Sequence, residues 1–217
     1  LGGGSGGRYY ADGEDAIHVV PDSRNLPTEF TEARFPFLVE RLGLAVDSGG
    51  PGQFRGGLGY DKHIRMLKAG SFMSIADRSI LACWGVRGGL AGQPFSVVVD
   101  AGGPAEREVD ALADGEPVKA GEVIRIRTTG GGGWGDPLDR AVDAVVRDVR
   151  WGKVSVAGAR RDYGVVLAED GTADQAGTAD LRAALRAARP EVRPFFDRGP
   201  GYATLSGGAR YADVDLL

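Results

Sequence analysis

Short alternating segments make up most of the first 128 residues. In 122–128, Ile124 and Ile126 share one face while Arg125 and Arg127 share the other, which is the period-two pattern of a half-buried strand. Comparable runs rich in Val, Ile, Leu and aromatic residues predict strands at 16–20, 37–46, 58–68, 71–76, 79–84, 95–100 and 122–128. Turns rich in Gly, Pro and Asp separate them, at 47–52, 88–94, 101–104 and 113–117. Many short strands joined by such turns predict an antiparallel β-sandwich or a barrel-like sheet.

Helical periodicity begins only at Asp136, which with Pro137 forms a pair typical of a helix N-terminus. Apolar residues then recur on one helical face, at 138, 142, 145, 146 and 149. Further helices are predicted at 155–162, ended by Gly164, and from Thr178 as N-cap to 189, with 163–167 extended between them. The predicted fold class is therefore α+β: mainly antiparallel β, followed by a few short helices and an extended C-terminal tail that covers another surface.

Composition shifts divide the chain into four predicted regions. Residues 1–15 are a Gly-rich N-terminal segment, 16–167 form the main domain, 168–177 are a polar linker, and 178–217 are a helix with the C-terminal tail. The opening Gly/Ser run is typical either of a flexible spacer or of a native glycine loop that begins at an arbitrary point. We therefore expect the N-terminal boundary to be artificial.

The overall composition narrows the function classes. A length of 217 residues with 42% hydrophobic content supports one moderate domain with a core. The formal net charge of −4 argues against a nucleic-acid binder or an electrostatic membrane binder, because those carry a basic surface. No apolar run approaches the ~20 residues that span a bilayer. The single cysteine, Cys83, lies in an apolar stretch, and a free buried thiol suits a cytoplasmic location.

The glycine run 130–135 matches the G-x-G-x-x-G pattern of dinucleotide sites. Hairpins rather than a βαβ unit precede it, no acidic residue follows about twenty residues later, and Asp136 already places a negative charge at the next helix N-terminus. The same pattern also occurs at 2–7. We therefore favour a tight structural loop, with Gly132 and Trp134 as candidate residues lining a cleft.

Two polar segments offer further candidate ligands. Around Pro27, Asn25 could fix a turn by bonding to the backbone, or Asn25 and Glu29 could face a substrate, and both alternatives stay open. In 47–59 the abundant glycine predicts positive-φ turns or close approach of chain segments. Arg55 in this block suits a carboxylate or phosphate ligand, although a salt bridge with Asp47 is the favoured interpretation.

The histidines do not predict a metal site. His18 and His63 are far apart, and neither has a His or Cys neighbour at the spacing of metal ligands. Both are expected to be ordinary strand residues, although His18 or a carboxylate could complete a site supplied by other sequence. No metal is therefore expected to bind to this chain alone.

Several of these blocks together resemble the hydantoinase B/oxoprolinase family. The similar blocks are Asn25-Leu-Pro-Thr-Glu29 with Phe35-Pro, then the Asp-Ser-Gly-Gly run in 47–59, then Gly-Gly-Gly-Gly-Trp-Gly-Asp-Pro-Leu in 130–138, and the short block 161–166. They occur in the order expected for the C-terminal portion of such proteins. The resemblance covers about residues 2 to 167, and its two glycine blocks at this separation are more specific together than either is alone.

The resemblance implies an ATP-dependent opening of cyclic amides such as hydantoins and 5-oxoproline. It implies a hydantoinase A-type ATPase partner, an upstream part of the same subunit, and a small-molecule substrate. ATP and a divalent metal are expected in the complete complex, with neither bound by this segment alone, so the segment by itself is expected to be inactive. One alternative is a subunit of an acetone- or acetophenone-type ketone carboxylase, and another is a non-catalytic scaffold of such a complex. No catalytic residue is assigned.

Overall fold

The computed structural model describes residues 1–18, 25–189 and 194–207. Its largest sheet has the strand order β1-β2-β8-β5-β6, with every neighbouring pair antiparallel. The strands are β1 (Phe37–Leu44), β2 (Tyr60–Met66), β5 (Ser96–Val99), β6 (Arg107–Val109) and β8 (Val123–Arg127). Within the described residues this sheet is open, with β1 and β6 at its edges. The predicted α+β class with mainly antiparallel strands is thus confirmed, without closure into a barrel.

A second sheet of two strands covers one face of the first. It pairs β3 (Gly70–Ile75) with β7 (Leu112–Val118). Val118 of β7 packs with Val97, Val99 and Ile124 in a buried cluster, because the alternating strands of the large sheet turn their apolar side chains to this face. The opposite face of the large sheet carries the arginines of β8.

Two sequence predictions about strands are wrong. Residues 79–84 form no strand, and the short β4 (Gly85–Val86) instead begins just after them and pairs with β9 (Phe196–Asp197). The predicted turn at 113–117 lies inside β7, where Gly115 adopts a positive φ of 71° opposite a register shift in β3. Glycine and proline are tolerated there because a two-stranded sheet has open edges and a bulge takes up the irregularity. The strand predicted at 16–20 is described only to residue 18, where Ile17 bridges Gly3.

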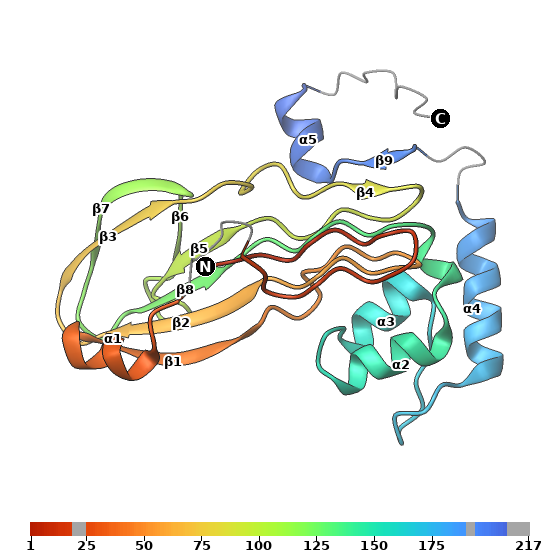
Figure 1. Ribbon diagram of the computed structural model, residues 1–217, viewed down its shortest axis with the longest axis horizontal. Helices are drawn as coiled ribbons and strands as arrows, with labels where there is room; N and C mark the ends of the chain where they lie inside the picture. Colours follow the sequence, from red (N-terminus) through yellow and green to blue (C-terminus); the bar gives the residue numbers. More distant parts are fainter. Residues whose placement is uncertain (19–24, 190–193, 208–217) are drawn as a thin grey trace.

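The helices lie together at one end of the molecule, except α1 (Thr28–Arg34) beside the sheet and α5 (Pro200–Leu205) near β4 (Figure 1). The predicted helix after Asp136 is divided into a 3₁₀ turn, η1 (Pro137–Asp139), and α2 (Val142–Arg150). Asp136 caps the turn as expected, but Arg140 has an extended backbone that ends it. The side chain of Arg140 enters a buried network of charged groups between the helices and the glycine-rich segments.

The next helices follow the predicted order. In α3 (Val156–Tyr163), the Ser155 side chain caps the N-terminus and Gly164 ends the helix with a φ of 61°. In α4 (Gln175–Ala187) the cap is Asp174 rather than the predicted Thr178. Thr178 is buried, and its hydroxyl accepts a hydrogen bond from the Val166 amide at 3.0 Å. The helix therefore begins inside the predicted linker 168–177.

Glycine-rich segments run side by side between the sheet and the helices (Figure 1). We call the segments 2–7, 49–59, 85–92 and 130–135 the glycine bundle. Backbone hydrogen bonds join them: Gly57 N donates to Ser5 O at 2.8 Å, Gly131 N to Gly57 O at 2.9 Å, and Gly133 N to Leu90 O at 2.9 Å. The close approach predicted for 47–59 is therefore confirmed, and residues 2–7 are part of the same packing.

The spacing in the bundle leaves no room for side chains at its inner positions. A Cβ placed on Gly56 would lie 1.9 Å from the carbonyl oxygen of Gly131. As at the axis of the collagen triple helix, only glycine fits where backbones approach this closely. The glycine content of this chain is thus a packing requirement of one layer of the fold.

Candidate functional site

Gly132 and Trp134 are held inside the glycine bundle. A Cβ on Gly132 would lie 1.8 Å from the carbonyl oxygen of Trp84, so this residue is enclosed by backbone. Trp134 exchanges two backbone hydrogen bonds with Phe54, at 2.9 and 3.0 Å, and the two rings are 5.9 Å apart. Both candidates therefore contribute to packing between segments, and neither borders the open pocket on the polar face of the large sheet.

The backbone amides of 130–135 are already used. Those of Gly130, Gly131, Gly133, Trp134 and Gly135 each donate to a carbonyl of a neighbouring segment at 2.9–3.1 Å. A phosphate-binding glycine loop needs amides that point freely at the ligand. This geometry does not fit a pyrophosphate, and it agrees with the structural interpretation of the G-x-G-x-x-G match.

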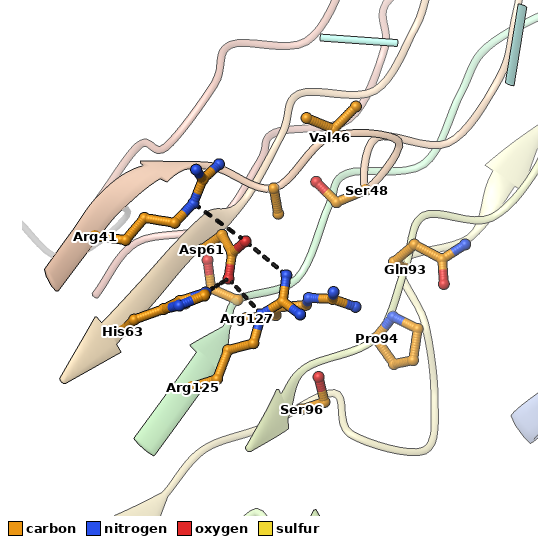
Figure 2. A pocket seen from close by; sticks show the side chains of 12 residues that line it. Arg41, Val46, Ser48, Asp61, His63, Gln93, Pro94, Ser96, Arg125 and Arg127 are labelled. Atoms are coloured by element: carbon orange, nitrogen blue, oxygen red, sulfur yellow. Dashed lines mark hydrogen bonds and ion pairs between the residues drawn. The ribbon is translucent and has the colours of Figure 1, made fainter. Parts of the chain in front are cut away.

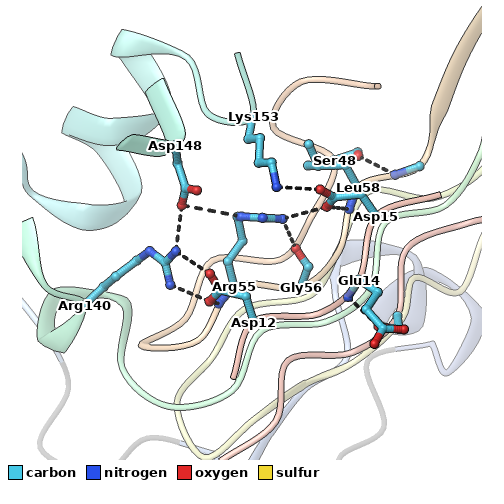
Figure 3. A network of polar contacts seen from close by, with 12 residues as sticks. Asp12, Glu14, Asp15, Ser48, Arg55, Gly56, Leu58, Arg140, Asp148 and Lys153 are labelled. Atoms are coloured by element: carbon cyan, nitrogen blue, oxygen red, sulfur yellow. Dashed lines mark hydrogen bonds and ion pairs between the residues drawn. The ribbon is translucent and has the colours of Figure 1, made fainter. Parts of the chain in front are cut away.

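Arg55 lies in a buried network rather than in an open cleft (Figure 3). Its side chain is 2% exposed, with Nη1 3.3 Å from Asp15 and Nε 3.5 Å from Asp148. The predicted salt bridge with Asp47 is wrong. Residues 12–15 and 148 are distant from residue 55 in the chain, so local sequence could not identify them as its partners.

A second arginine completes the network. Arg140 binds both carboxylate oxygens of Asp12, at 2.6 and 2.7 Å, and Asp148 at 2.7 Å, while Lys153 binds Asp15 at 2.7 Å. We call these six residues the buried ion network: Asp12, Asp15, Arg55, Arg140, Asp148 and Lys153. Its formal charges cancel, and it connects the N-terminal segment, the glycine bundle and α2. We interpret it as the fastening between these layers.

The pKa values of the network follow from these contacts. Burial alone would raise the pKa of Asp12, but hydrogen bonds from Arg140 and the Arg55 amide, with both guanidinium charges, lower it below its ordinary 3.8. Burial alone would likewise lower the pKa of Arg140, yet Asp12 and Asp148 raise it. The network therefore stays fully ionised near neutral pH.

The remaining predicted candidates do not meet in one place. The Asp47 carboxylate accepts a hydrogen bond from the Ser155 amide at 2.8 Å, which fixes the start of α3. Asn25 precedes α1, and Glu29 is exposed in its first turn. Neither Asn25 nor Glu29 makes a hydrogen bond or an ion pair with the residues that the structure describes, and α1 lies at the far end of the sheet from the bundle (Figure 1). The six candidates therefore do not form a single cleft.

An open pocket that local sequence pattern did not reveal lies on the polar face of the large sheet (Figure 2). We call it the basic pocket, a cavity of about 450 Å³. Its charged wall comes from β1, β2 and β8, and its rim includes Gln93 and Pro94, which precede β5. The lining residues are Arg41, Ala45, Val46, Ser48, Asp61, His63, Gln93, Pro94, Ser96, Arg125, Arg127 and Thr128.

Strand register brings these charges together. Asp61 on β2 lies opposite Arg127 on β8, and His63 lies opposite both Arg125 and Arg41. Residues two apart on a strand face the same side, so five adjacent positions of one face carry ionisable groups. The alternation in 122–128 placed Arg125 and Arg127 on one face, but their neighbours could be known only from the register.

Asp61 is the only acidic residue among those that line the pocket. Arg125 binds it with two hydrogen bonds of 2.8 and 2.9 Å, His63 Nε2 is 3.1 Å away, and Arg41 Nε is 3.5 Å away. Burial would raise the pKa of Asp61, but the Arg125 hydrogen bonds and the surrounding cations lower it. With a neutral His63, three arginines and one aspartate leave a formal charge of +2 on this wall, in a chain whose net charge is −4.

The described residues do not supply a metal site. None of them forms a group of three or more His, Cys, Asp or Glu side chains with the geometry to hold an ion. His63 faces Asp61 and arginines, a cationic surrounding that does not suit a divalent cation. In the parts of the chain that the structure describes, no helix combines the length and apolar character needed to cross a membrane.

Comparison with known proteins gives one consistent result. The family described as hydantoinase B/oxoprolinase matches residues 1–137. A putative D-/L-hydantoinase of the B type from Pseudomonas sp. is 31% identical over 182 residues, which are 83% of this chain and 31% of that protein. The matched segment includes the glycine bundle and the strands of the basic pocket.

Two solved structures share the fold. The ATP-dependent caprolactamase from Pseudomonas jessenii has a TM-score of 0.67 and 29% identity, covering 83% of this chain and 32% of its own. A nucleotide-free structure of acetone carboxylase, an enzyme of ATP-dependent acetone carboxylation, has a TM-score of 0.75 and 25% identity, covering 88% and 30%. The chain spans only about a third of each relative. Since the family match extends over residues 1–137, more than half of its length, this chain belongs to the hydantoinase B/oxoprolinase family.

Proposed function

We propose that this chain is the C-terminal part of a subunit that opens cyclic amides with water in an ATP-dependent reaction. The carrying observation is that the chain matches a hydantoinase subunit and a caprolactamase, two proteins named for amide-ring substrates, along most of its length. The proposal includes a hydantoinase A-type ATPase partner and a small cyclic amide as substrate. A cytoplasmic location belongs to it as well, since the only cysteine, Cys83, is a free thiol.

ATP and a divalent metal are assigned by this proposal to the rest of the complex. The bundle amides that a nucleotide would need are bonded to carbonyls, and the described residues form no metal cluster. The contribution of this segment is then structural and electrostatic. The bundle and the buried ion network hold the sheet rigidly against the helices, and the basic pocket presents fixed positive charge to solvent.

A ketone carboxylase is the second candidate. It is favoured by the TM-score of 0.75 to acetone carboxylase, which exceeds the value of 0.67 for the caprolactamase. Both chemistries require ATP and differ in the second reactant, which is water for ring opening and bicarbonate for carboxylation. A scaffold without a direct role in either reaction is the third candidate, and the packed state of Gly132, Trp134 and Arg55 agrees with it.

The test is substrate-dependent ATP consumption by the complete subunit purified with its ATPase partner. We expect ADP formation to rise when hydantoin, 5-oxoproline or caprolactam is added, because ring opening is coupled to the nucleotide. Acetone with bicarbonate serves as the comparison reaction. ADP formation that responds to acetone and bicarbonate but to none of the amides would replace the first proposal by the second.

A further inference from the structure

We propose that the basic pocket binds a small molecule through an oxyanion, either a carboxylate or a phosphate group. The residues that line the pocket belong wholly to this chain, and its wall and rim are formed on β1, β2, β5 and β8. The binding site is therefore independent of whether the complete protein opens cyclic amides. Charge, free hydrogen-bond donors and size all favour such a ligand.

The charge arrangement is costly unless an anion completes it. Like charges at directly opposed positions of a sheet destabilise it, and here Arg41, His63 and Arg125 occupy one row across three strands. Asp61 can compensate only part of this charge, because Arg125 already takes both of its oxygens. An oxyanion in the pocket would neutralise the remainder.

Arg127 has the donors for such a ligand. Its side chain is exposed, and it makes no hydrogen bond or ion pair with any residue that the structure describes. Arg41, half exposed, reaches Asp61 only at 3.5 Å and with one nitrogen. A guanidinium can bind a carboxylate or a phosphate with two parallel hydrogen bonds, so Arg127 is the principal candidate. Figure 2 shows Arg41, Arg125 and Arg127 around Asp61 at the pocket wall.

The hydroxyl groups on the rim add neutral donors. Ser48 Oγ accepts a hydrogen bond from the Gly59 amide at 3.0 Å, which leaves its own hydrogen for a ligand. Ser96 lies next to Arg127 across the β5–β8 ladder and lines the pocket as well. Charged and neutral donors that converge in this way are typical of oxyanion sites.

An adjoining cavity defines where the anion lies. It has a volume of about 520 Å³, shares His63, Ser96, Arg125 and Arg127 with the basic pocket, and is bordered by Glu106 and by Val98. The Glu106 carboxylate would repel an anion on that side. The oxyanion therefore belongs on the Arg41 and Arg127 side, and the uncharged remainder of the ligand extends toward Val98. Two joined cavities of this size suit a small molecule.

Calorimetric titration of the 217-residue chain with inorganic phosphate, and separately with glutarate, tests the proposal. Both titrations are made at constant ionic strength in sodium chloride, so that general charge screening is equal. We expect saturable binding of at least one probe, weakened about tenfold or more by Arg127→Gln, because a charged hydrogen-bonding partner is lost. Arg127 is exposed, so this variant should fold normally, as the unfolding temperature will show.

Arg150→Gln is the matched control, since Arg150 is an exposed arginine on α2 outside the pocket. It should bind each probe within about twofold of the parent chain. Binding of phosphate alone would identify a phosphate group as the ligand chemistry, and binding of glutarate alone would identify a carboxylate. Absence of binding by both probes, or equal weakening in the two variants, would overturn the proposal. Neither result depends on ATP turnover, so the outcome is separate from that of the cyclic-amide assay.

Discussion

Gly56→Ala is expected to prevent stable folding, with a loss of at least about 4 kcal/mol in the free energy of unfolding. The added methyl carbon would lie 1.9 Å from the Gly131 oxygen and 2.5 Å from its carbonyl carbon. Both contacts are with backbone, which cannot move aside as a flexible side chain can. Moving the 130–135 segment would also break its hydrogen bonds to 57 and 90. Thermal unfolding followed by circular dichroism measures the loss.

Gly6→Ala is the control for this substitution, because Gly6 belongs to the same bundle but is exposed. Its added carbon would meet only the Gly132 oxygen, at 3.8 Å, which is ordinary van der Waals contact. We expect an unfolding temperature close to that of the parent chain. If the two alanine variants were equally stable, the tight packing of the bundle would be refuted.

Asp148→Asn is expected to lower the free energy of unfolding by about 3–5 kcal/mol. Asp148 is 3% exposed at its side chain and is shared by Arg140 at 2.7 Å and Arg55 at 3.5 Å. An amide of the same shape leaves two buried guanidinium groups with less negative charge around them. Removing one partner of a buried ion pair costs more than the pair itself contributes, because the other charge stays desolvated. Chemical denaturation at neutral pH measures the difference.

Asp180→Asn on α4 makes the same chemical change at an exposed position. Its expected effect is below about 0.5 kcal/mol, as for most surface substitutions. A loss of similar size in both variants would mean that the buried ion network does not fasten the layers together. A large loss in Asp148→Asn alone would support that role.

Local pattern was sufficient for the parts of the fold that depend on neighbours in sequence. Alternation predicted which face of β8 carries Ile124 and which carries Arg125, and capping residues predicted the ends of α3. The turn at 113–117 was wrong because Gly115 and Pro117 are punctuation in most contexts but are accommodated in a two-stranded sheet with a bulge.

The site depended on contacts that no local pattern contains. Arg55 has its partners at residues 12–15 and 148, so its predicted pairing with the nearby Asp47 failed. The basic pocket exists because the register places Arg41, His63 and Arg125 in one row, across a strand that has a bulge between Val39 and Arg41. A shift of one residue in that register would turn Arg41 to the other face. Sequence could therefore indicate the family and the faces of strands, but not this constellation.

The most direct test of the proposed function follows the substrate ring itself. The complete subunit with its ATPase partner is supplied with ATP, a cyclic amide and ¹³C-labelled bicarbonate, and the products are followed by NMR. We predict that the ring-opened amino acid appears in fixed proportion to ADP and that it contains no ¹³C from bicarbonate. ADP formed without ring opening, or labelled carbon incorporated into the product, would contradict the assignment as a cyclic-amide hydrolase.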